Sequence, residues 1–329
     1  MILTCGFDDR ARRFATGAGA LALAGVLAVP AAGHASIGGP SGVSGGALFG
    51  GTQRLVPAQH ALHRSLAVLR DYYTYGESFP DAAARQVMAE GGTVLVSLDG
   101  GPSYKEVAGG WDHGYFRSFL TAMNDAATKY HLGAIYFCYQ HEADNISAHV
   151  AHQGWAGGFR AAWAHLHYKA KEWGLNWNAG GHIYWTMIMM HGAFSPTATG
   201  QHRVQDYWAG QQEDDIIAVD GYNHAGCVNG VQQGMVTPGS LFDPALAYAA
   251  YKGKPVFVAE WGSQSGPQQV PFIELMQKYV TSRTAIEAAM YFDAGAQGRN
   301  ACDNVVNGDP VSLRALAVMG AAPRLRGHA

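Results

Sequence analysis

Residues 255–262 read PVFVAEWG, a run of apolar and β-branched residues that leads directly into Glu260. A strand that is buried on both faces, as in a parallel sheet, has this unbroken apolar character. Similar runs recur along the chain, and segments with the period of amphipathic helices separate them. The runs lie at residues 47–51, 67–73, 92–99, 133–140, 176–185, 215–222, 255–262 and 286–293. This alternation predicts a series of βα units.

A series of eight βα units predicts a fold of the α/β class, a single-domain (β/α)8 TIM barrel over residues 47–329. The chain of 329 residues is long enough for one such barrel with extended loops. A doubly wound open sheet is the main alternative. That fold carries a glycine-rich phosphate-binding turn after its first strand, and no such turn follows residues 47–51. The barrel is therefore the favoured prediction.

The beginning of the chain differs in composition from the rest. Three arginines within residues 10–13 precede an apolar run at 18–29, and small residues follow that run. This pattern is typical of a secretory signal peptide, which we predict over residues 1–35, followed by a Gly/Ser-rich leader over residues 36–46. An uncleaved membrane anchor is the alternative. We expect a secreted, extracellular protein, exported by the Sec or the twin-arginine route, with no membrane segment after cleavage.

Charge and motif content argue against several functional classes. The formal net charge of -3 gives no basic field that would attract nucleic acid. The clustered histidines, His149 with His152 and His165 with His167, form neither an HExxH motif nor a compact metal-binding triad. The predicted barrel, residues 47–329, also lacks a GxSxG nucleophile elbow, and the chain lacks a P-loop. We therefore expect no cofactor and no metal, and a monomer is the default expectation.

The four cysteines fit an exported protein. Cys5 lies in the predicted signal peptide, and Cys138 lies in the apolar run GAIYFCYQ, which predicts a buried free thiol. Cys227 and Cys302 lie in Gly/Asn-rich loop sequence, NHAGCVNG and GRNACDNVVNG. Because disulfides form in oxidising compartments, we predict a Cys227–Cys302 disulfide between these two loops.

Two of the predicted strands lead into a glutamate. The fourth is followed by Glu142, and the seventh contains Glu260 near its end. In a barrel of this kind the reactive groups project from the carboxyl ends of the strands, and the fourth and seventh strands are nearly opposite. Two such carboxyl groups can hydrolyse a glycoside, with retention at a separation of about 5 to 5.5 Å and with inversion at about 6.5 to 9.5 Å. The residues alone leave that choice open.

Four stretches, in the same order, resemble glycoside hydrolase family 26, a group of retaining clan A barrel enzymes that includes mannanases. They are YQHEADN at 139–145, EDDIIAVDGYN at 213–223, KPVFVAEWGS at 254–263 and IEAAMYFDAG at 286–295. The resemblance implies that Glu142 is the general acid/base and Glu260 the nucleophile. It also implies that His141 and Tyr222 are the neighbours that position these groups and the substrate.

The sequence also departs from the family in two places. Family members commonly carry an arginine three residues before the histidine and a tryptophan soon after the glutamate. Here Cys138 occupies the first place, and the next tryptophan is Trp155. The resemblance implies a secreted retaining β-glycanase that cleaves mannan or a related β-linked polysaccharide by double displacement. A non-catalytic carbohydrate-binding barrel is the alternative, and these two departures from the family pattern support it.

Aromatic residues at strand ends are candidates for the sugar-binding surface, because sugar rings present apolar faces. Trp185, Trp261 and Tyr291 lie at predicted carboxyl ends of strands, so we expect them to contact an oligosaccharide or polysaccharide substrate. Asp220 and Asn223, in the VDGYN stretch, are interpreted as structural rather than chemical.

Overall fold

The computed structural model describes residues 47–145, 155–227, 234–295 and 302–325. The described residues all belong to one compact unit, Ser36–Ala329. The predicted signal peptide and the whole of the predicted leader, residues 1–46, lie outside the described residues. None of the helices in the described part of the chain is long and apolar enough to cross a bilayer.

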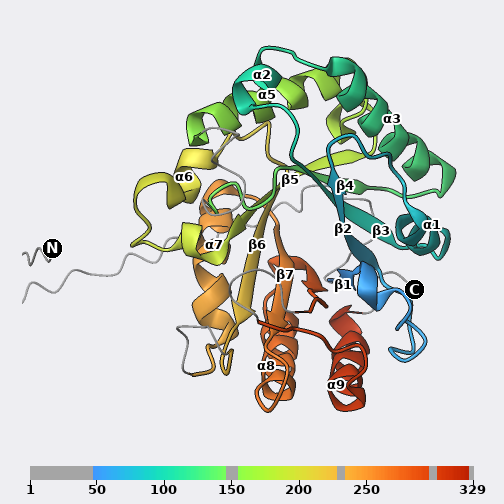
Figure 1. Ribbon diagram of the computed structural model, residues 1–329, viewed down its shortest axis with the longest axis vertical. Helices are drawn as coiled ribbons and strands as arrows, with labels where there is room; N and C mark the ends of the chain where they lie inside the picture. Colours follow the sequence, from blue (N-terminus) through green and yellow to red (C-terminus); the bar gives the residue numbers. More distant parts are fainter. Residues whose placement is uncertain (1–46, 146–154, 228–233, 296–301, 326–329) are drawn as a thin grey trace, which may run out of the picture. The chain divides into compact units, whose positions relative to one another are not determined.

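The core of the molecule is a closed barrel of parallel strands in sequence order, with β8 paired to β1 (Figure 1). The strands are β1 Leu48–Thr52, β2 Val68–Thr74, β3 Thr93–Asp99, β4 Ile135–Tyr139, β5 Ile183–Met190, β6 Ile216–Asn223, β7 Val256–Ser263 and β8 Ile286–Tyr291. The predicted single-domain (β/α)8 barrel is therefore confirmed. Because all strands are parallel, their carboxyl ends meet at one rim of the barrel.

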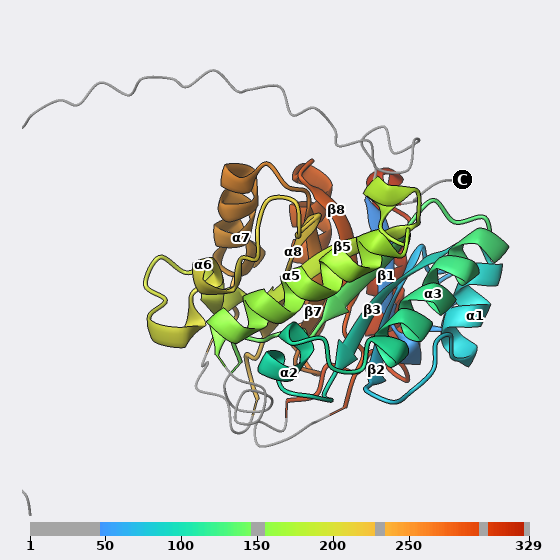
Figure 2. The ribbon, with the colours of Figure 1, turned by 90° about the horizontal axis from the view of Figure 1, so that it is seen from above.

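Helices surround the barrel on its outer side (Figure 2). They are α1 Ala82–Ala89, α2 Tyr104–Ala108, α3 His113–Lys129, α5 Ala156–Glu172, α6 Val204–Tyr207, α7 Pro238–Lys252, α8 Gln269–Ser282 and α9 Pro310–Gly320. Local sequence explains where they begin. For example, Thr237 caps the first turn of α7 and Pro238 occupies its first position, where a missing N–H has no cost.

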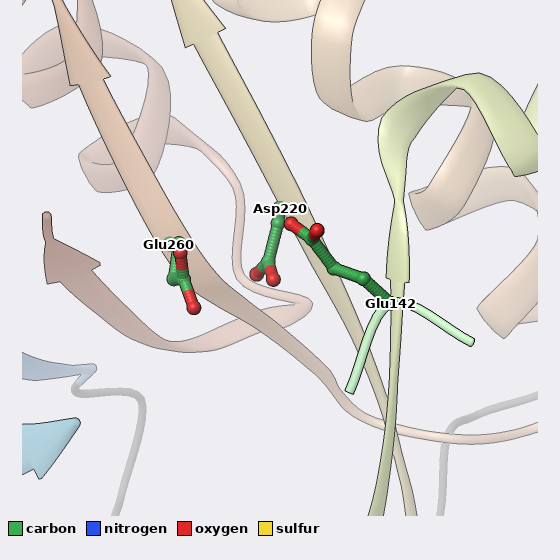
Figure 3. A group of neighbouring side chains, drawn as sticks. All are labelled: Glu142, Asp220 and Glu260. Carbon is green, nitrogen blue, oxygen red and sulfur yellow. The ribbon is translucent and has the colours of Figure 1, made fainter. Parts of the chain in front are cut away.

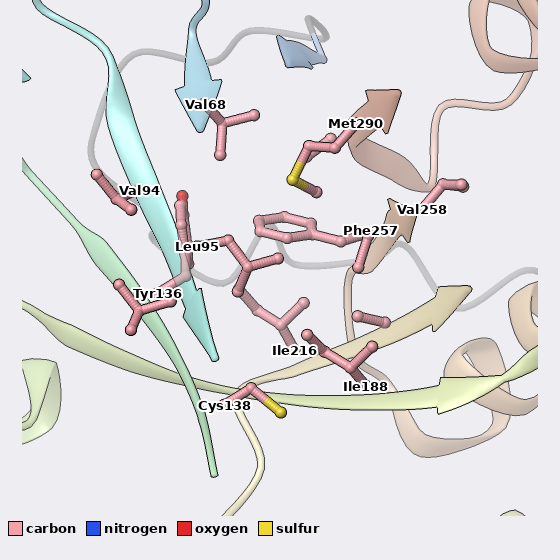
Figure 4. Packing of buried hydrophobic residues seen from close by; sticks show 14 of the residues in the cluster. Val68, Val94, Leu95, Tyr136, Cys138, Ile188, Ile216, Phe257, Val258 and Met290 are labelled. Atoms are coloured by element: carbon pink, nitrogen blue, oxygen red, sulfur yellow. The ribbon is translucent and has the colours of Figure 1, made fainter. Parts of the chain in front are cut away.

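The barrel interior is filled by side chains of opposite strands (Figure 4). Tyr136 of β4 and Phe257 of β7 meet edge to face, with ring centroids 4.8 Å apart. Aliphatic residues such as Leu95 and Ile188 pack in the same cluster and are fully buried. Cys138 of β4 is buried and free, as predicted. The interior is thus a solid core, which holds the rim and its functional groups in fixed positions.

The fifth strand differs from its prediction. The sequence predicted a strand at residues 176–185, but β5 is Ile183–Met190. Residues Trp177–Ala179 form a 3-10 turn instead, and Gly180 follows in a left-handed conformation with φ 91°. The apolar run IYWTMIMM, which begins only after the glycines, is the segment that enters the barrel. Trp185 is consequently the third residue of the strand and not its last.

Candidate active site

Three carboxyl groups converge at the rim of the barrel (Figure 3). Glu142 comes from the loop after β4, Asp220 from β6 and Glu260 from β7. One carboxylate oxygen from each residue lies within 4.8 Å of the corresponding oxygens of the other two. The two glutamates that the sequence singled out are therefore brought together, and a third carboxyl group joins them.

Glu260 lies inside strand β7, and only 3% of its surface is exposed. Its Oε1 accepts a hydrogen bond from the Tyr72 hydroxyl at 2.7 Å and pairs with Arg70 Nη2 at 3.0 Å. Its Oε2 accepts a hydrogen bond from the Tyr222 hydroxyl. Both oxygens thus have a donor, and one of them faces a positive charge. Hydrogen bonds and an ion pair of this kind hold a carboxylate in a fixed position.

Arg70 is a fully buried arginine in strand β2. Its guanidinium lies over the Tyr72 ring, 4.3 Å from the centroid, in addition to its ion pair with Glu260. Burial alone would lower the pKa of Arg70, but Tyr72, Glu260 and Asp220 together raise it above its ordinary value. The group therefore stays charged at every pH at which the protein is folded, and it supplies a permanent positive charge beside Glu260.

Glu142 has a different environment. The backbone of the loop is left-handed at Gln140 and at Glu142, with φ of 58° and 50°. The Glu142 N–H donates to the Ile188 carbonyl of β5 at 3.0 Å, which fixes the turn. Its Oε2 accepts one hydrogen bond, from Asn145 Nδ2 at 3.1 Å. Burial raises the pKa of Glu142, and the negative charge of Glu260 raises it further.

His141 is held by a carboxylate of the neighbouring strand. Its Nδ1 lies 2.7 Å from Oδ2 of Asp99, the last residue of β3, and its ring centroid lies 5.5 Å from that of Tyr72. Burial would lower the pKa of His141, but the charge of Asp99 and the hydrogen bond to it raise that pKa. The structure therefore places His141 beside both the Glu142 loop and the ring that binds Glu260.

Asp220 was interpreted as structural, but its side chain lies in the carboxyl cluster. It pairs with Glu260 in the sheet register and is fully buried. Burial raises the pKa of Asp220 well above its ordinary value, and the charges of Glu260 and Glu142 add to this effect. The spacing of the three carboxyl groups would suit a metal ion. Both oxygens of Glu260 already accept hydrogen bonds, however, and one of them pairs with Arg70, whose positive charge would oppose a cation at the cluster.

Asn223, in contrast, has the structural role that the sequence predicted. Its Nδ2 donates to Ser263 Oγ at 3.0 Å, and its Oδ1 accepts from the Val236 N–H at 3.3 Å. These bonds join the carboxyl ends of β6 and β7 to the segment before α7. The residue therefore supports the loops around the site.

The three aromatic residues expected to bind substrate lie outside the site. Trp185 is fully buried and packs against Phe137, with its Nε1 donating to Asn176 at 2.9 Å. Trp261 is fully buried and meets Tyr291 edge to face at 4.8 Å. Tyr291 donates its hydroxyl to the Asn304 carbonyl at 2.8 Å. These residues pack outside the barrel, so this part of the prediction is wrong.

Side-chain alternation explains the outcome for Trp261. Successive side chains of a strand point to opposite faces. Glu260 points into the site, so Trp261 points outward, where its ring contacts Phe272 of α8 with centroids 6.3 Å apart. The residue that follows Glu260 in the strand therefore points away from the site and cannot contact a substrate bound there.

The sequence analysis missed four residues of the site, which are Arg70, Tyr72, Asp99 and Asp220. One signal was present. The run AVLRDYY, at residues 67–73, places a charged arginine in a strand that was predicted to be buried. A buried charge requires a partner, so Arg70 indicated a carboxylate inside the barrel rim.

The predicted disulfide between Cys227 and Cys302 is present, with Cα atoms 5.2 Å apart. It joins the loop after β6 to the segment after β8 across a sequence separation of 75 residues. These two strands flank β7, which carries Glu260. The disulfide therefore ties together the loops on both sides of the Glu260 strand.

A hollow lies at the opposite rim of the barrel and holds none of these residues. Its volume is about 1050 Å³, and it is lined by residues 61–67, residues 90–92 and one face of α9. The amino-terminal rim of this fold generally serves stability, whereas the reactive groups lie at the carboxyl rim. Size alone therefore does not identify the site, and we assign it to the carboxyl cluster.

Several solved structures share this fold. The chain resembles a modular endo-β-1,4-mannanase of glycoside hydrolase family 26 from Cellulomonas fimi, with a TM-score of 0.58 and 13% identity over 86% of this chain and 73% of that one. It resembles the catalytic domain of a family 26 endo-β-1,4-mannanase from Bacillus sp. JAMB-750, with a TM-score of 0.55 and 13% identity over 86% and 88%.

A fungal β-1,4-galactanase is also similar, with a TM-score of 0.55 and 11% identity over 83% of this chain and 98% of that one. No family model matches the chain, and no curated protein matches it by sequence. At these identities the likenesses establish a common fold, and function has to be argued from the site itself.

Proposed function

We propose that this protein is a retaining glycoside hydrolase, in which Glu260 is the nucleophile and Glu142 the general acid/base. The observation that carries the proposal is the pair of opposed environments at close range. Oxygens of the two carboxyl groups lie within 4.8 Å, one group surrounded by donors and the other kept protonated by burial and by its neighbour's charge. This close approach is compatible with the separation of about 5 to 5.5 Å in retaining enzymes, which is shorter than the roughly 6.5 to 9.5 Å of inverting enzymes.

The proposed reaction has two displacements. In the first, Glu260 attacks the anomeric carbon while Glu142 gives its proton to the departing glycosidic oxygen, which leaves as an alcohol. In the second, Glu142 takes a proton from water, and the resulting hydroxide displaces Glu260 from the sugar. The product is a hemiacetal of the original configuration, and both carboxyl groups return to their starting states.

Electrostatic coupling between the two groups fits this change of role. The Glu260 charge raises the pKa of Glu142 in the free enzyme, which keeps the acid protonated. Once Glu260 is esterified to the sugar, that charge is gone and Glu142 releases its proton more readily. The same side chain can thus act first as acid and then as base.

Arg70, Tyr72 and Tyr222 are proposed to stabilise the ionised nucleophile. Arg70 also bears on the alternative of a non-catalytic sugar-binding barrel. That alternative rested in part on Cys138, which stands where family members commonly carry an arginine. The Arg70 guanidinium, from strand β2, lies close enough to Cys138 to influence its pKa. A positive charge is therefore supplied to this region by a different strand, which supports the enzyme over the binding protein.

We further propose a β-linked polysaccharide, of the mannan type or related to it, as the substrate, and secretion as the route to it. The likeness to mannanases and a galactanase supports the substrate class, and the disulfide supports an oxidising compartment. The decisive experiment combines a reducing-sugar assay on β-mannan, β-1,4-galactan, mixed-linkage β-glucan and xylan with proton NMR of the first product formed. Retained anomeric configuration is expected, and initial appearance of the inverted anomer would overturn the mechanism.

A further inference from the structure

A cluster of one exposed and two half-buried aromatic residues lies on the same rim of the barrel as the carboxyl groups. Trp111, between α2 and α3, has 52% of its surface exposed although it is one of the largest apolar side chains of the protein. Tyr75 directly follows strand β2, and Tyr115 lies in the first turn of α3. We call Trp111, Tyr75 and Tyr115 the Trp111 platform. All three belong to segments that follow the carboxyl ends of β2 and β3.

The platform is held in place by contacts that do not depend on a ligand. The rings of Tyr75 and Tyr115 have centroids 4.4 Å apart, and those of Tyr75 and Trp111 are 6.4 Å apart. The Tyr75 hydroxyl donates to the Asp112 carboxylate, and the Tyr115 hydroxyl donates to the Glu77 carbonyl at 2.9 Å. The rings are therefore ordered before any partner binds, which lowers the entropic cost of binding.

Glycine at position 101 is part of this construction. A Cβ atom there would lie 2.6 Å from the Tyr75 ring, so only glycine lets the chain after β3 pass beneath that ring. Gly101 also has a φ of 85°, a conformation that other residues rarely adopt. The loop after β3 is thus shaped around Tyr75.

The platform is connected to the site through Asp99. The Tyr75 N–H donates to the Asp99 carbonyl at 2.8 Å, and the Asp99 side chain binds His141 at 2.7 Å. His141 directly precedes Glu142 in the chain. Tyr75 of the platform is thus bonded directly to Asp99, the residue that orients His141. The platform lies beside the carboxyl ends of β2 and β3.

The chemistry of the platform matches a sugar polymer. Aromatic faces stack on the apolar faces of sugar rings, and nearby carboxylates accept hydrogen bonds from hydroxyl groups. Asp112 and Glu77 supply such carboxylates beside the rings. We propose that the Trp111 platform binds the part of a β-linked polysaccharide that extends beyond the sugars at Glu142 and Glu260. This inference rests on the proposed function and specifies how that site engages a long substrate.

The test compares long and short substrates in the full chain. Relative to the parent, Trp111→Ala should lower the ratio of kcat/KM on the hydrolysed polysaccharide to kcat/KM on an aryl β-glycoside of a single sugar. A fall of about tenfold is expected, equivalent to about 1.4 kcal/mol, and it should appear mainly in KM for the polymer. Trp111→Phe, which keeps an aromatic face, should recover part of the loss.

Tyr251→Ala is the matched control, since Tyr251 is an aromatic residue with 82% of its surface exposed near the end of α7, which leads to the opposite rim. It should leave the ratio unchanged. A direct binding measurement accompanies the kinetics. Glu260→Ala and the double variant Glu260→Ala/Trp111→Ala are run through gels that contain β-mannan, β-1,4-galactan, mixed-linkage β-glucan or xylan. The single variant should be retarded in at least one gel and the double variant much less.

The outcomes separate the platform from the proposed function. If the parent hydrolyses none of the polymers but Trp111→Ala abolishes its retardation in a gel, the platform stands and the proposed hydrolase does not. If the parent hydrolyses a polymer and the ratio is the same in Trp111→Ala, the platform is overturned. An altered oligomeric state in Trp111→Ala, with no change in ratio or retardation, would also overturn it and assign the surface to a protein partner. The platform is also overturned if Glu260→Ala is not retarded in any gel and Trp111→Ala leaves the ratio of kcat/KM values unchanged.

Discussion

The two catalytic candidates are held by very different parts of the molecule. Glu260 lies within a strand of the barrel and receives donors from strands β2 and β6, whereas Glu142 lies in a left-handed loop with a single amide donor from three residues further along. A nucleophile has to stay ionised and in place, because it attacks a defined atom. An acid/base has to gain and lose a proton within one reaction cycle. The rigid site suits the first duty, and the less heavily bonded site suits the second.

Removing the rigid group should have the largest effect. Glu260→Ala eliminates the carboxylate that is proposed to form the covalent intermediate, so kcat/KM should fall by about 10⁴-fold or more, equal to roughly 5.5 kcal/mol of barrier, on every substrate. Steady-state kinetics on the polysaccharide and on an aryl β-glycoside measure this loss. Substantial activity on either substrate would mean that another group is the nucleophile.

Removing the acid/base should harm substrates unequally. Glu142→Ala should lose about 100- to 1,000-fold on the polysaccharide, whose leaving alcohol needs a proton, and far less on an aryl glycoside with a good leaving group. Added azide should accelerate turnover of the aryl glycoside and give the β-glycosyl azide, because azide attacks without a general base. Product analysis by NMR identifies it, and formation of the α-azide would contradict the assignment.

The same variant tests the pH dependence. Since burial and the Glu260 charge raise the pKa of Glu142, the parent should retain its acid, and hence its activity on the polysaccharide, up to that raised pKa. Activity should then fall as the pH rises through it. This basic limb should be missing from the profile of Glu142→Ala on the aryl glycoside. If the limb persists there, a different group sets it.

Arg70 tests whether the donors around Glu260 matter for catalysis. Arg70→Met keeps the length of the side chain but removes the charge, and we expect a loss of about 100-fold in kcat/KM, equal to roughly 2.7 kcal/mol. Arg70→Lys is the control, since it retains the charge and should recover part of the activity. Equal activity of Arg70→Met and the parent would make the ion pair irrelevant to the reaction.

The disulfide should have the smallest effect on the reaction itself. It ties the loops beside the Glu260 strand, whereas residues 140–145 around Glu142 contain no cysteine. The double variant Cys227→Ser/Cys302→Ser should lose about 2 to 4 kcal/mol of unfolding free energy, because its unfolded chain is no longer cross-linked. Its kcat at 25 °C should stay within about threefold of the parent, or roughly 0.7 kcal/mol.

Denaturant unfolding of the disulfide variant measures the first quantity, and the parent treated with dithiothreitol is the control that should reproduce it. The variant itself should not respond to the reductant. A variant as stable as the oxidised parent would show that these loops need no cross-link.

The sequence was sufficient to predict the barrel and the pair of glutamates, because both depend on short-range patterns. An apolar run followed by a polar residue marks a buried strand and its rim, and this held for seven of the eight runs as strands at nearly their predicted positions. It failed at residues 176–185, where Trp177 and two glycines belong to a turn before β5. Because the predicted strand ended at residue 185 and β5 ends at Met190, Trp185 was wrongly assigned to the rim.

The rest of the site depends on contacts that the sequence does not encode locally. The outward direction of Trp261 depends on an irregular register of β7 between Val258 and Trp261, which interrupts the alternation that begins at Phe257. Tyr72 and Arg70 reach Glu260 from positions 188 and 190 residues away in the chain. Only the closure of the barrel brings β2 to face β7. The Trp111 platform was missed for the same reason, because the order of its rings comes from the packing of the loop after β3 against Tyr75.

The left-handed backbone at Gln140 and Glu142 has a consequence for the evolution of this chain. Residues with side chains are unfavourable in that conformation, whereas glycine adopts it freely. Selection for stability alone would therefore favour glycine at both positions. At Glu142 such a change would delete the carboxyl group, and at Gln140 it would delete the amide that donates to the Gly100 carbonyl at 2.7 Å. Under the proposed function, the loop gives up stability for activity at Glu142, and a search for stabilising substitutions would select the position that carries the proposed acid/base.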